Sequence, residues 1–183
     1  MKIEGSVVFI TGGGSGLGLD AARTLQARGA KLSIVDYSEE NLASAKKLLG
    51  EKDVLYAKVD VSRESECKEA VEQTFKHFGA IHVCLNSAGI VDVLSLMVTR
   101  DSVIDFETFR HMMEINLFGT VYCAAFCAFY MSKNKADERG VIINIASVAA
   151  YEAAKGMVSY GASKGAVAGI ALPIARDLGK FGI

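Results

Sequence analysis

The chain has 183 residues, of which 51% are hydrophobic, and its formal net charge at pH 7 is −1. This length is enough for one well-buried domain, so we expect residues 1–183 to form a single domain. The balanced charge gives no footprint for nucleic acid, and no uninterrupted apolar run approaches the roughly 20 residues of a membrane-spanning helix, so we expect neither nucleic acid nor membrane as a partner.

Apolar segments alternate with longer amphipathic segments along the chain. The apolar segments predict strands at 7–11, 31–36, 54–60, 83–86 and 141–147. The amphipathic segments predict helices at 16–28, 39–49, 63–78, 105–131 and 159–180. The alternation predicts an α/β fold: a Rossmann-like, doubly wound parallel sheet with helices on both faces. The continuous apolar run 141–145 favours a strand covered on both faces, and we expect the irregular segment 90–104 to form a loop over the site.

Polar or glycine-rich residues stand at the carboxyl ends of all five predicted strands. In an open parallel sheet, ligands bind outside these ends, where the strand order reverses. The residues concerned are the glycine-rich loop 11–18, Asp36, Asp60 with Val61, the run Asn86, Ser87, Ala88 and Gly89, and Ser147. Their common position predicts one binding site.

The glycine-rich loop joins a predicted strand to a predicted helix, which is the context of a dinucleotide-binding loop. Gly12 permits the tight turn, Gly16 lets the backbone approach a pyrophosphate, and Gly18 allows close helix packing. Ser15 and Leu17 are expected to contact the cofactor beside them. A Walker phosphate loop is excluded because no Gly-Lys-Ser/Thr follows, and an ordinary glycine-rich turn is the alternative.

Two aspartates are expected to contact the adenosine part of the cofactor. Asp36 can accept hydrogen bonds from ribose hydroxyls and would repel a 2′-phosphate. No Lys or Arg lies in the glycine-rich loop or directly after Asp36, so NAD is favoured over NADP. We expect Asp60, with Val61, to contact the adenine. The alternatives are a helix-capping role for Asp36 and a simple helix start at Asp60.

Two Tyr-x-x-x-Lys pairs occur, at 151–155 and at 160–164. Tyr160 and Lys164 are expected inside the last helix, where this spacing places phenol and ammonium on one face. The ammonium favours the phenolate, which can exchange a proton with a substrate, and Ser147 offers a hydroxyl donor to the same substrate oxygen. Tyr151 is expected to line the substrate pocket or to pack.

The four cysteines, Cys67, Cys84, Cys123 and Cys127, follow no metal-ligand spacing, and we expect no metal site. Small apolar neighbours favour buried thiols at Cys123 and Cys127 over a redox or metal pair. Free thiols fit a reducing intracellular compartment, the cytoplasm or the mitochondrial matrix. The three scattered histidines are expected in structural or surface roles.

In motif content and order the chain resembles the short-chain dehydrogenase/reductase family from residue 7 to its end. The motifs are Thr-Gly-x-x-x-Gly-x-Gly, the strand-end Asp36, Asp60-Val61, Asn86-Ser87-Ala88-Gly89, Asn116, Ser147 and Tyr160-x-x-x-Lys164. This chain has Asn86-Ser87 where the family usually has Asn-Asn. Segments 139–150 and 172–178 are similar to the type-2 3-hydroxyacyl-CoA dehydrogenases, also called 17β-hydroxysteroid dehydrogenase type 10. The chain stops where the family's sixth strand begins, so we expect the C-terminal part of the fold to be missing.

The resemblance implies an NAD-dependent enzyme that interconverts a secondary alcohol and a ketone on a small molecule, a 3-hydroxyacyl-CoA or a hydroxysteroid. Tyr160 would act as general base, Lys164 would also hold the nicotinamide ribose, and Ser147 would bind the substrate oxygen. The backbone at Asn116 would position a water that relays protons from Lys164. The resemblance also implies a homodimer or homotetramer. The alternative is a dinucleotide-binding fragment without turnover, in a structural or regulatory role.

Overall fold

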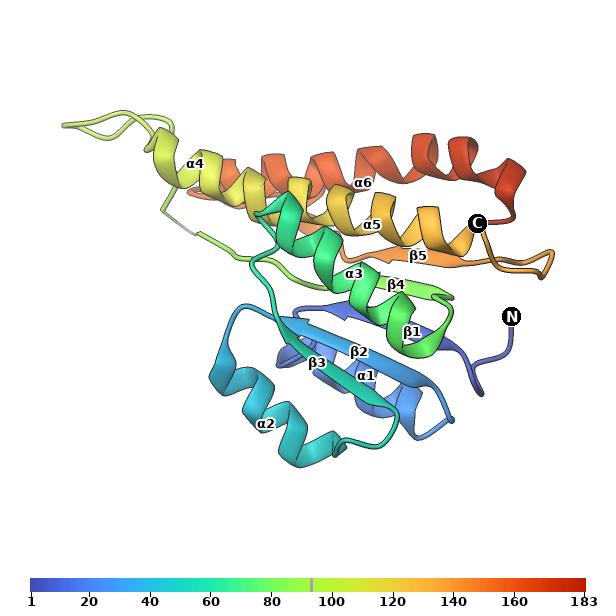
Figure 1. The fold of residues 1–183 in the computed structure, drawn as a ribbon. Coiled ribbons are helices and arrows are strands. Elements are labelled where there is room, and N and C mark those ends of the chain that lie inside the picture. Colours follow the sequence, from blue (N-terminus) through green and yellow to red (C-terminus); the bar gives the residue numbers. More distant parts are fainter. Residues whose placement is uncertain (93) are drawn as a thin grey trace.

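The computed structural model describes residues 1–92 and 94–183, and the expected loop at 90–104 therefore falls partly outside the described residues. The strands are β1 (Val7–Thr11), β2 (Lys31–Asp36), β3 (Val54–Lys58), β4 (Val83–Asn86) and β5 (Val141–Asn144). The α-helices are α1 (Gly16–Gln26), α2 (Glu39–Leu49), α3 (Glu64–Phe78), α4 (Phe106–Met113), α5 (Gly119–Met131) and α6 (Val158–Leu178). One π-helical segment, η1 (Glu114–Phe118), joins α4 to α5 (Figure 1). Two 3-10 segments are η2 (Val148–Ala150) and η3 (Gly179–Phe181).

The five strands form one sheet in the order β3-β2-β1-β4-β5, and every neighbouring pair is parallel. The chain first builds outward from β1 to β3 and then crosses to β4 on the other side of β1. The order therefore reverses between β1 and β4, which is the switch point at which such sheets bind ligands. The predicted Rossmann-like, doubly wound fold is confirmed.

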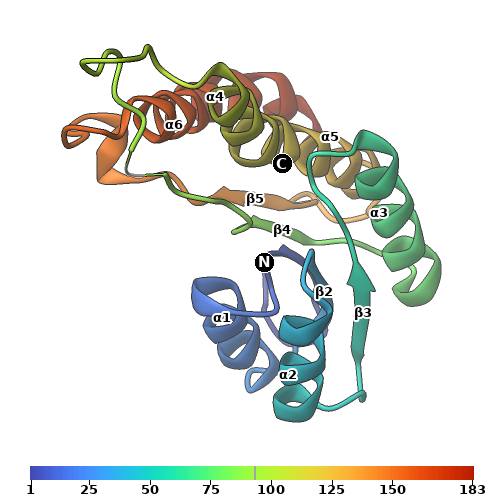
Figure 2. The ribbon, with the colours of Figure 1, turned by 90° about the vertical axis from the view of Figure 1, so that its left-hand side faces the viewer.

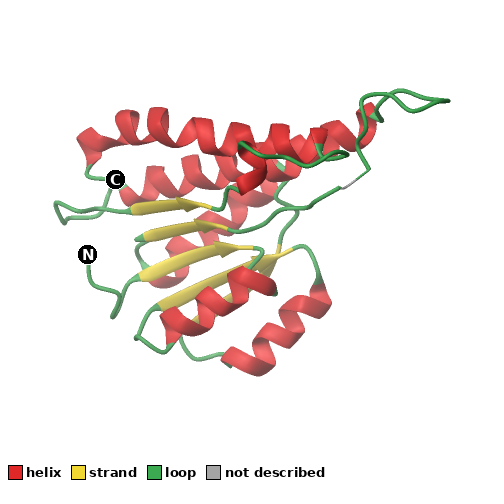
Figure 3. Cartoon of the chain, turned by 180° about the vertical axis from the view of Figure 1, so that it is seen from behind, coloured by secondary structure: helices red, strands yellow, loops and turns green. Residues whose placement is uncertain are grey.

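Helices cover the two faces of the sheet unequally. Figures 2 and 3 show α1 and α2 on one face and α3, α5 and α6 on the other. The side chains of β1 alternate accordingly: Val8 and Ile10 belong to the core under α1 and α2, whereas Phe9 belongs to the core under α3 and α5. All three are fully buried, so both layers are anchored on the central strand.

Strand β5 is an edge strand, and it differs from its expectation in two ways. It ends at Asn144, so Ser147 lies three residues beyond the strand and begins η2 instead. Val141 and Ile143 are 42% and 44% exposed, so the predicted cover on both faces is wrong for the described residues. The apolar composition of the segment could not reveal this, because exposure depends on which elements lie beside it.

One long helix was expected at 105–131, and the structure divides it. The segment is continuous, but η1 interrupts the α-helical hydrogen-bond pattern around Asn116. Single π-helical turns of this kind often occur at functional sites. By length and composition the helix Phe106–Met131 is apolar enough to cross a membrane. However, α5 packs against α3 and β4, as a core helix does.

The prediction of buried cysteines is confirmed. All four are free and buried, and they share the core cluster under α3 and α5. A hydrogen bond with Cys67, together with burial, raises the pKa of the Cys123 thiol, and burial raises the pKa of Cys127. A raised pKa disfavours the reactive thiolate, so these side chains act as small core residues.

Candidate active site

An open cavity of about 600 Å³ lies at the carboxyl ends of the strands, at the switch point between β1 and β4. This volume is in the range of small-molecule binding sites. Ten residues of the predicted cofactor-binding set lie on its wall: Gly12, Ser15, Gly16, Leu17, Asp36, Asp60, Val61, Ser87, Ala88 and Gly89. Seven wall residues had not been expected from the sequence: Tyr37, Ser38, Asn41, Val59, Ile90, His111 and Ile115.

The glycine-rich loop is held close to its neighbours. A Cβ on Gly12 would lie 2.8 Å from the Cα of Ala88, so the loop lies directly against the segment after β4. A Cβ on Gly18 would overlap the carbonyl oxygen of Gly12, so the start of α1 packs tightly against the loop. Gly18 therefore serves the packing that was predicted for it, although it does not itself line the cavity.

Asp36 is the last residue of β2 and is only 8% exposed. Its Oδ2 accepts the N–H of Gly14 at 3.0 Å, and its Oδ1 accepts the N–H of Ser38 at 2.9 Å. Ser38, not Asp36, is the N-cap of α2, because its hydroxyl accepts the N–H of Asn41. Asn41 Nδ2 donates to Asp36 Oδ1 as well, at 3.4 Å. A carboxylate has about four lone-pair sites, so Asp36 keeps about one acceptor site free after these three bonds.

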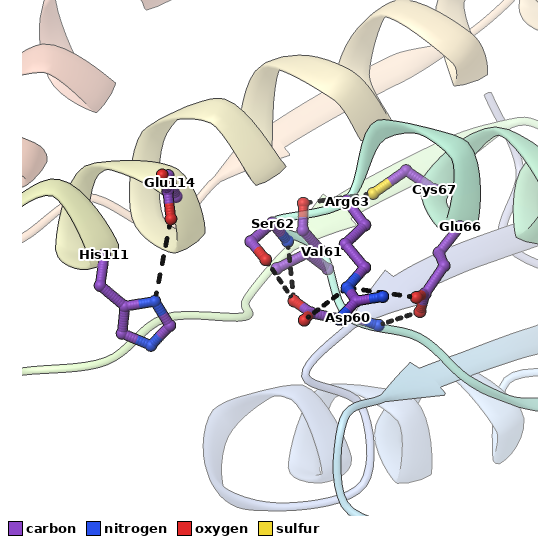
Figure 4. A network of polar contacts seen from close by, with 8 residues as sticks. All are labelled: Asp60, Val61, Ser62, Arg63, Glu66, Cys67, His111 and Glu114. Carbon is purple, nitrogen blue, oxygen red and sulfur yellow. Dashed lines mark hydrogen bonds and ion pairs between the residues drawn. The ribbon is translucent and has the colours of Figure 1, made fainter.

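Asp60 lies on the cavity wall after the neighbouring strand β3, close to Asp36, because the N–H of Val59 donates to the Asp36 carbonyl at 2.9 Å. Asp60 also orders the start of α3. Its Oδ1 accepts the N–H and the hydroxyl of Ser62, at 3.0 and 2.6 Å (Figure 4). Burial opposes ionisation of Asp60, but hydrogen bonds from Ser62 and the positive charge of Arg63 outweigh it and lower the pKa. The carboxylate is thus held in its charged form. Asp60 lines the cavity and also helps to start α3, and its contact with an adenine stays a prediction.

Val61 and His111 complete the wall around Asp60. The N–H of Val61 donates to no acceptor within the described residues, so a ligand could accept a hydrogen bond from it. His111 lies on α4 and also lines the cavity, with its Nδ1 3.9 Å from Glu114 Oε2 (Figure 4). The expected surface position of His111 is confirmed, since its side chain is 61% exposed, but the sequence did not indicate that it also lines the cavity. No sequence signal marks it, because its place depends on how α4 packs over the sheet.

Hydrogen bonds of side chains hold the segment 86–89, which begins at the end of β4. Thr11 Oγ1 accepts the N–H groups of Ser87 and Ala88, each at 3.1 Å. Asn86, predicted to bind the cofactor, does not line the cavity, and its Nδ2 donates to the Asn144 Oδ1 at 2.9 Å and to the Thr120 carbonyl at 3.3 Å. Asn86 is 3% exposed. The structure therefore gives it a role in holding β4 against β5 and α5.

Asn116 connects three parts of the chain from within η1. Its Oδ1 accepts the N–H of Ile90 at 2.8 Å, and its Nδ2 donates to the Ile90 carbonyl at 2.9 Å. The same Nδ2 donates to Ser163 Oγ on α6 at 2.9 Å. Its backbone carbonyl accepts the hydroxyl of Thr120 at 2.8 Å. Ser163 is a further residue that sequence reasoning missed.

Lys164 is buried in the second turn of α6. Its Nζ donates to the carbonyl of Ile145 at 2.7 Å and lies 5.9 Å from the centre of the Tyr160 ring. Burial lowers the pKa of Lys164. A Cβ on Gly89 would lie 3.4 Å from this ammonium, so Lys164 stands directly behind the wall residue at that end of the cavity. The predicted pairing of Tyr160 and Lys164 on one face of the helix is consistent with this geometry.

Ser147 lies next to the first turns of α6. Its Oγ accepts the N–H of Ala149 at 3.1 Å and thereby caps η2. A Cβ on Gly161 would lie 3.1 Å from the Ala149 carbonyl, so the slim face of α6 packs against the segment that follows Ser147. Tyr151, at the end of η2, is 84% exposed, so the expectation that it packs is wrong.

Comparisons with known proteins agree with this arrangement. The sequence model of the short chain dehydrogenase family matches residues 6–183. The chain is 40% identical to the 3-hydroxyacyl-CoA dehydrogenase type-2 of Rattus norvegicus and 38% identical to that of Homo sapiens. Each alignment covers 100% of this chain and 71% of the relative. A short-chain type dehydrogenase/reductase from Mycobacterium ulcerans superposes with a TM-score of 0.88 at 28% identity, over 99% of this chain and 65% of the other.

Proposed function

The chain belongs to the short-chain dehydrogenase/reductase family of oxidoreductases, and on that premise we propose that it uses NAD to interconvert a secondary alcohol and a ketone. The observation that carries the proposal is the position of Lys164 directly behind Gly89, because Gly89 lines a cavity whose other walls suit a dinucleotide. Neither Lys164 nor Tyr160 is itself on the cavity wall. In this proposal the glycine-rich loop binds the cofactor, and the Tyr160 and Lys164 pair exchanges the proton at the end of the cavity marked by Gly89.

The cavity walls fit NAD. The first-turn N–H groups of α1 belong to the end of the glycine-rich loop and have no intrahelical partners, which suits a pyrophosphate. The spare acceptor capacity of Asp36 suits the ribose hydroxyls, and the N–H of Val61 suits a ring nitrogen of adenine. No Lys or Arg lines the described part of the cavity, which favours NAD over a cofactor with a 2′-phosphate. Bound NAD would supply the hydride acceptor for alcohol oxidation.

Three side chains of this protein would handle the substrate oxygen and its proton. Tyr160 takes the proton from the substrate hydroxyl as a general base. Lys164 supports the phenolate by its adjacent positive charge and holds the nicotinamide ribose. Ser147 donates a hydrogen bond to the substrate oxygen and stabilises the charge that develops there. Asn116, through its backbone and a bound water, completes the proton path from Lys164.

The similarity to the type-2 3-hydroxyacyl-CoA dehydrogenases supports a 3-hydroxyacyl-CoA as substrate, with a hydroxysteroid as the second choice. We place the protein inside the cell, in the cytoplasm or the mitochondrial matrix, because its four cysteines are free.

We expect a homodimer or homotetramer, since the outer helices expose apolar side chains such as Phe129 and Leu172, each 57% exposed.

The experiment that tests the function measures binding and turnover separately. Quenching of intrinsic fluorescence gives the dissociation constant of NADH, and NADH formation from a 3-hydroxybutyryl-CoA or a hydroxysteroid gives the rate. The proposal expects both binding and turnover. Binding of NADH with no oxidation of either alcohol would support the alternative, a dinucleotide-binding protein without catalysis.

A further inference from the structure

Ser95 lies in the connection between β4 and α4, yet its hydrogen bonds are made with the start of α6, more than 60 residues away. Its N–H donates to the Gly156 carbonyl at 2.9 Å, and its hydroxyl donates to the same carbonyl at 3.3 Å. The Ser95 hydroxyl also accepts the N–H of Ser159 at 3.0 Å. Ser95 pairs with Met157 as an isolated parallel bridge. Ser95 is only 5% exposed, so these contacts are shielded from water.

The start of α6 lacks a cap of its own. The N-cap position is Met157, whose side chain makes no capping hydrogen bond. The first N–H groups of a helix have no intrahelical partners and need acceptors from elsewhere. The Ser159 hydroxyl does not supply one, because it is buried without a hydrogen-bond partner among the described residues. The Ser95 hydroxyl therefore occupies the place that an N-cap side chain normally fills.

The residue that follows Ser159 is Tyr160, so the first turn of α6 carries the phenol. We propose that Ser95 is a positioning residue: its hydroxyl caps α6 from the β4–α4 connection and fixes the turn that presents Tyr160. Ser95 acts through the Ser159 N–H and touches neither substrate nor cofactor. The inference rests on the proposed function for its kinetic consequence, whereas the cap itself is independent of it.

The cap is tested by amide hydrogen exchange. NMR measures the exchange rate of each amide. In the unaltered protein, the Ser159 amide should exchange slowly, whereas the first-turn amide of Leu17 on α1, a helix without a side-chain cap, should exchange fast. In Ser95→Ala, amides of the first turn of α6 should exchange roughly 3- to 30-fold faster, which is the effect of losing an N-cap. Ser159→Ala is the matched control: it removes the buried, unpartnered hydroxyl of the residue whose N–H is capped but keeps that N–H, and it should leave exchange unchanged.

The positioning role is tested by measuring kcat and the dissociation constant of NADH separately in each variant. Ser95→Ala should lower kcat about 10-fold or more while the dissociation constant of NADH stays within about twofold, because the glycine-rich loop is untouched. Ser95→Thr keeps the hydroxyl and should restore most of kcat and of the protection. Retained NADH binding shows in each case that the variant is folded.

Three results would overturn the inference. They are a rapidly exchanging Ser159 amide in the unaltered protein, unchanged exchange and kcat in Ser95→Ala, and a Ser95→Thr variant no better than Ser95→Ala although it binds NADH. The first measurement needs no variant, so it tests whether the Ser159 N–H is capped even if Ser95→Ala fails to fold. If the unaltered protein binds NADH without turning over any alcohol, the proposed function fails, and the exchange arm still decides whether Ser95 caps α6.

Discussion

Gly12 lies directly against Ala88, so closely that a Cβ on Gly12 would be 2.8 Å from the Ala88 Cα. The contact joins the loop after β1 to the segment after β4, across the point where the strand order reverses. Gly12 also has a φ of +59°, a conformation that side chains with a Cβ rarely adopt. The close contact with Ala88 and the positive φ thus both require glycine at this wall residue of the cavity.

Gly12→Ala should therefore abolish detectable NADH binding and lower the melting temperature, since backbone atoms would have to move to admit the methyl group. The matched control is Gly169→Ala in α6, where nothing lies within 4 Å of the new Cβ. That change should raise stability by about 0.5–1 kcal/mol, the usual gain for alanine in a helix interior. Fluorescence titration and thermal melting check both variants. Full NADH affinity in Gly12→Ala would contradict the geometry.

Asp36 sets the expected cofactor preference. The protein should bind NADH much more tightly than NADPH, and Asp36→Ala should reduce this difference by about 1–3 kcal/mol, the effect of losing a charged hydrogen-bond acceptor. Because Asp36 also accepts two backbone N–H groups, Asp36→Asn is the milder companion variant. Asp20→Ala, on the exposed surface of α1, is the control. Equal dissociation constants for the two cofactors in the unaltered protein would refute the prediction.

The sequence predicted five parallel strands and ten wall residues, because apolar runs and the glycines and acidic residues after them are local signals, but β3 and β5 end two and three residues earlier than predicted. It could not predict the contacts that depend on packing. Ser95 and Ser159 are 64 positions apart, and nothing in either segment indicates that one caps the other. His111 is an ordinary surface residue by its helix pattern, and it reaches the cavity only because of where α4 lies. The π-helical turn at Asn116 likewise reflects contacts to Ile90 and α6 that no local pattern encodes.

His82 should make stability depend on pH. Its Nδ1 accepts the N–H of Val7 at 3.0 Å, and burial lowers its pKa below the ordinary value of 6.5. The unfolded chain thus binds the proton more readily, so stability is lost as the pH falls from about 6.5 toward the lowered pKa of the folded state. Melting temperatures at about pH 8 and pH 5.5 measure the effect. The drop should be smaller in His82→Gln than in the exposed control His77→Gln, and equal drops would exclude this role.

The apolar surface of the outer helices should hold subunits together. Sedimentation velocity at micromolar concentration should give a dimer or tetramer. Leu172→Glu on α6 should weaken the assembly, because burying a carboxylate in an apolar interface is costly. Leu48→Glu on α2 is the control, since Leu48 is equally exposed, at 57%, but lies on the other face of the sheet. A clean monomer in the unaltered protein would count against the assignment.

The two Tyr-x-x-x-Lys pairs allow the most direct test of the mechanism. Tyr160 lies in the first turns of α6 with Lys164 beside it, whereas Tyr151 is 84% exposed at the end of η2. Positioned general bases contribute about 10²–10⁴-fold to the rate. The decisive measurement is the rate of NADH formation from a 3-hydroxyacyl-CoA or hydroxysteroid in the two Tyr→Phe variants, with NADH binding measured in parallel. Tyr160→Phe should lose at least about 100-fold in kcat and still bind NADH, and Tyr151→Phe should change substrate affinity at most. An active Tyr160→Phe together with an inactive Tyr151→Phe would contradict the account.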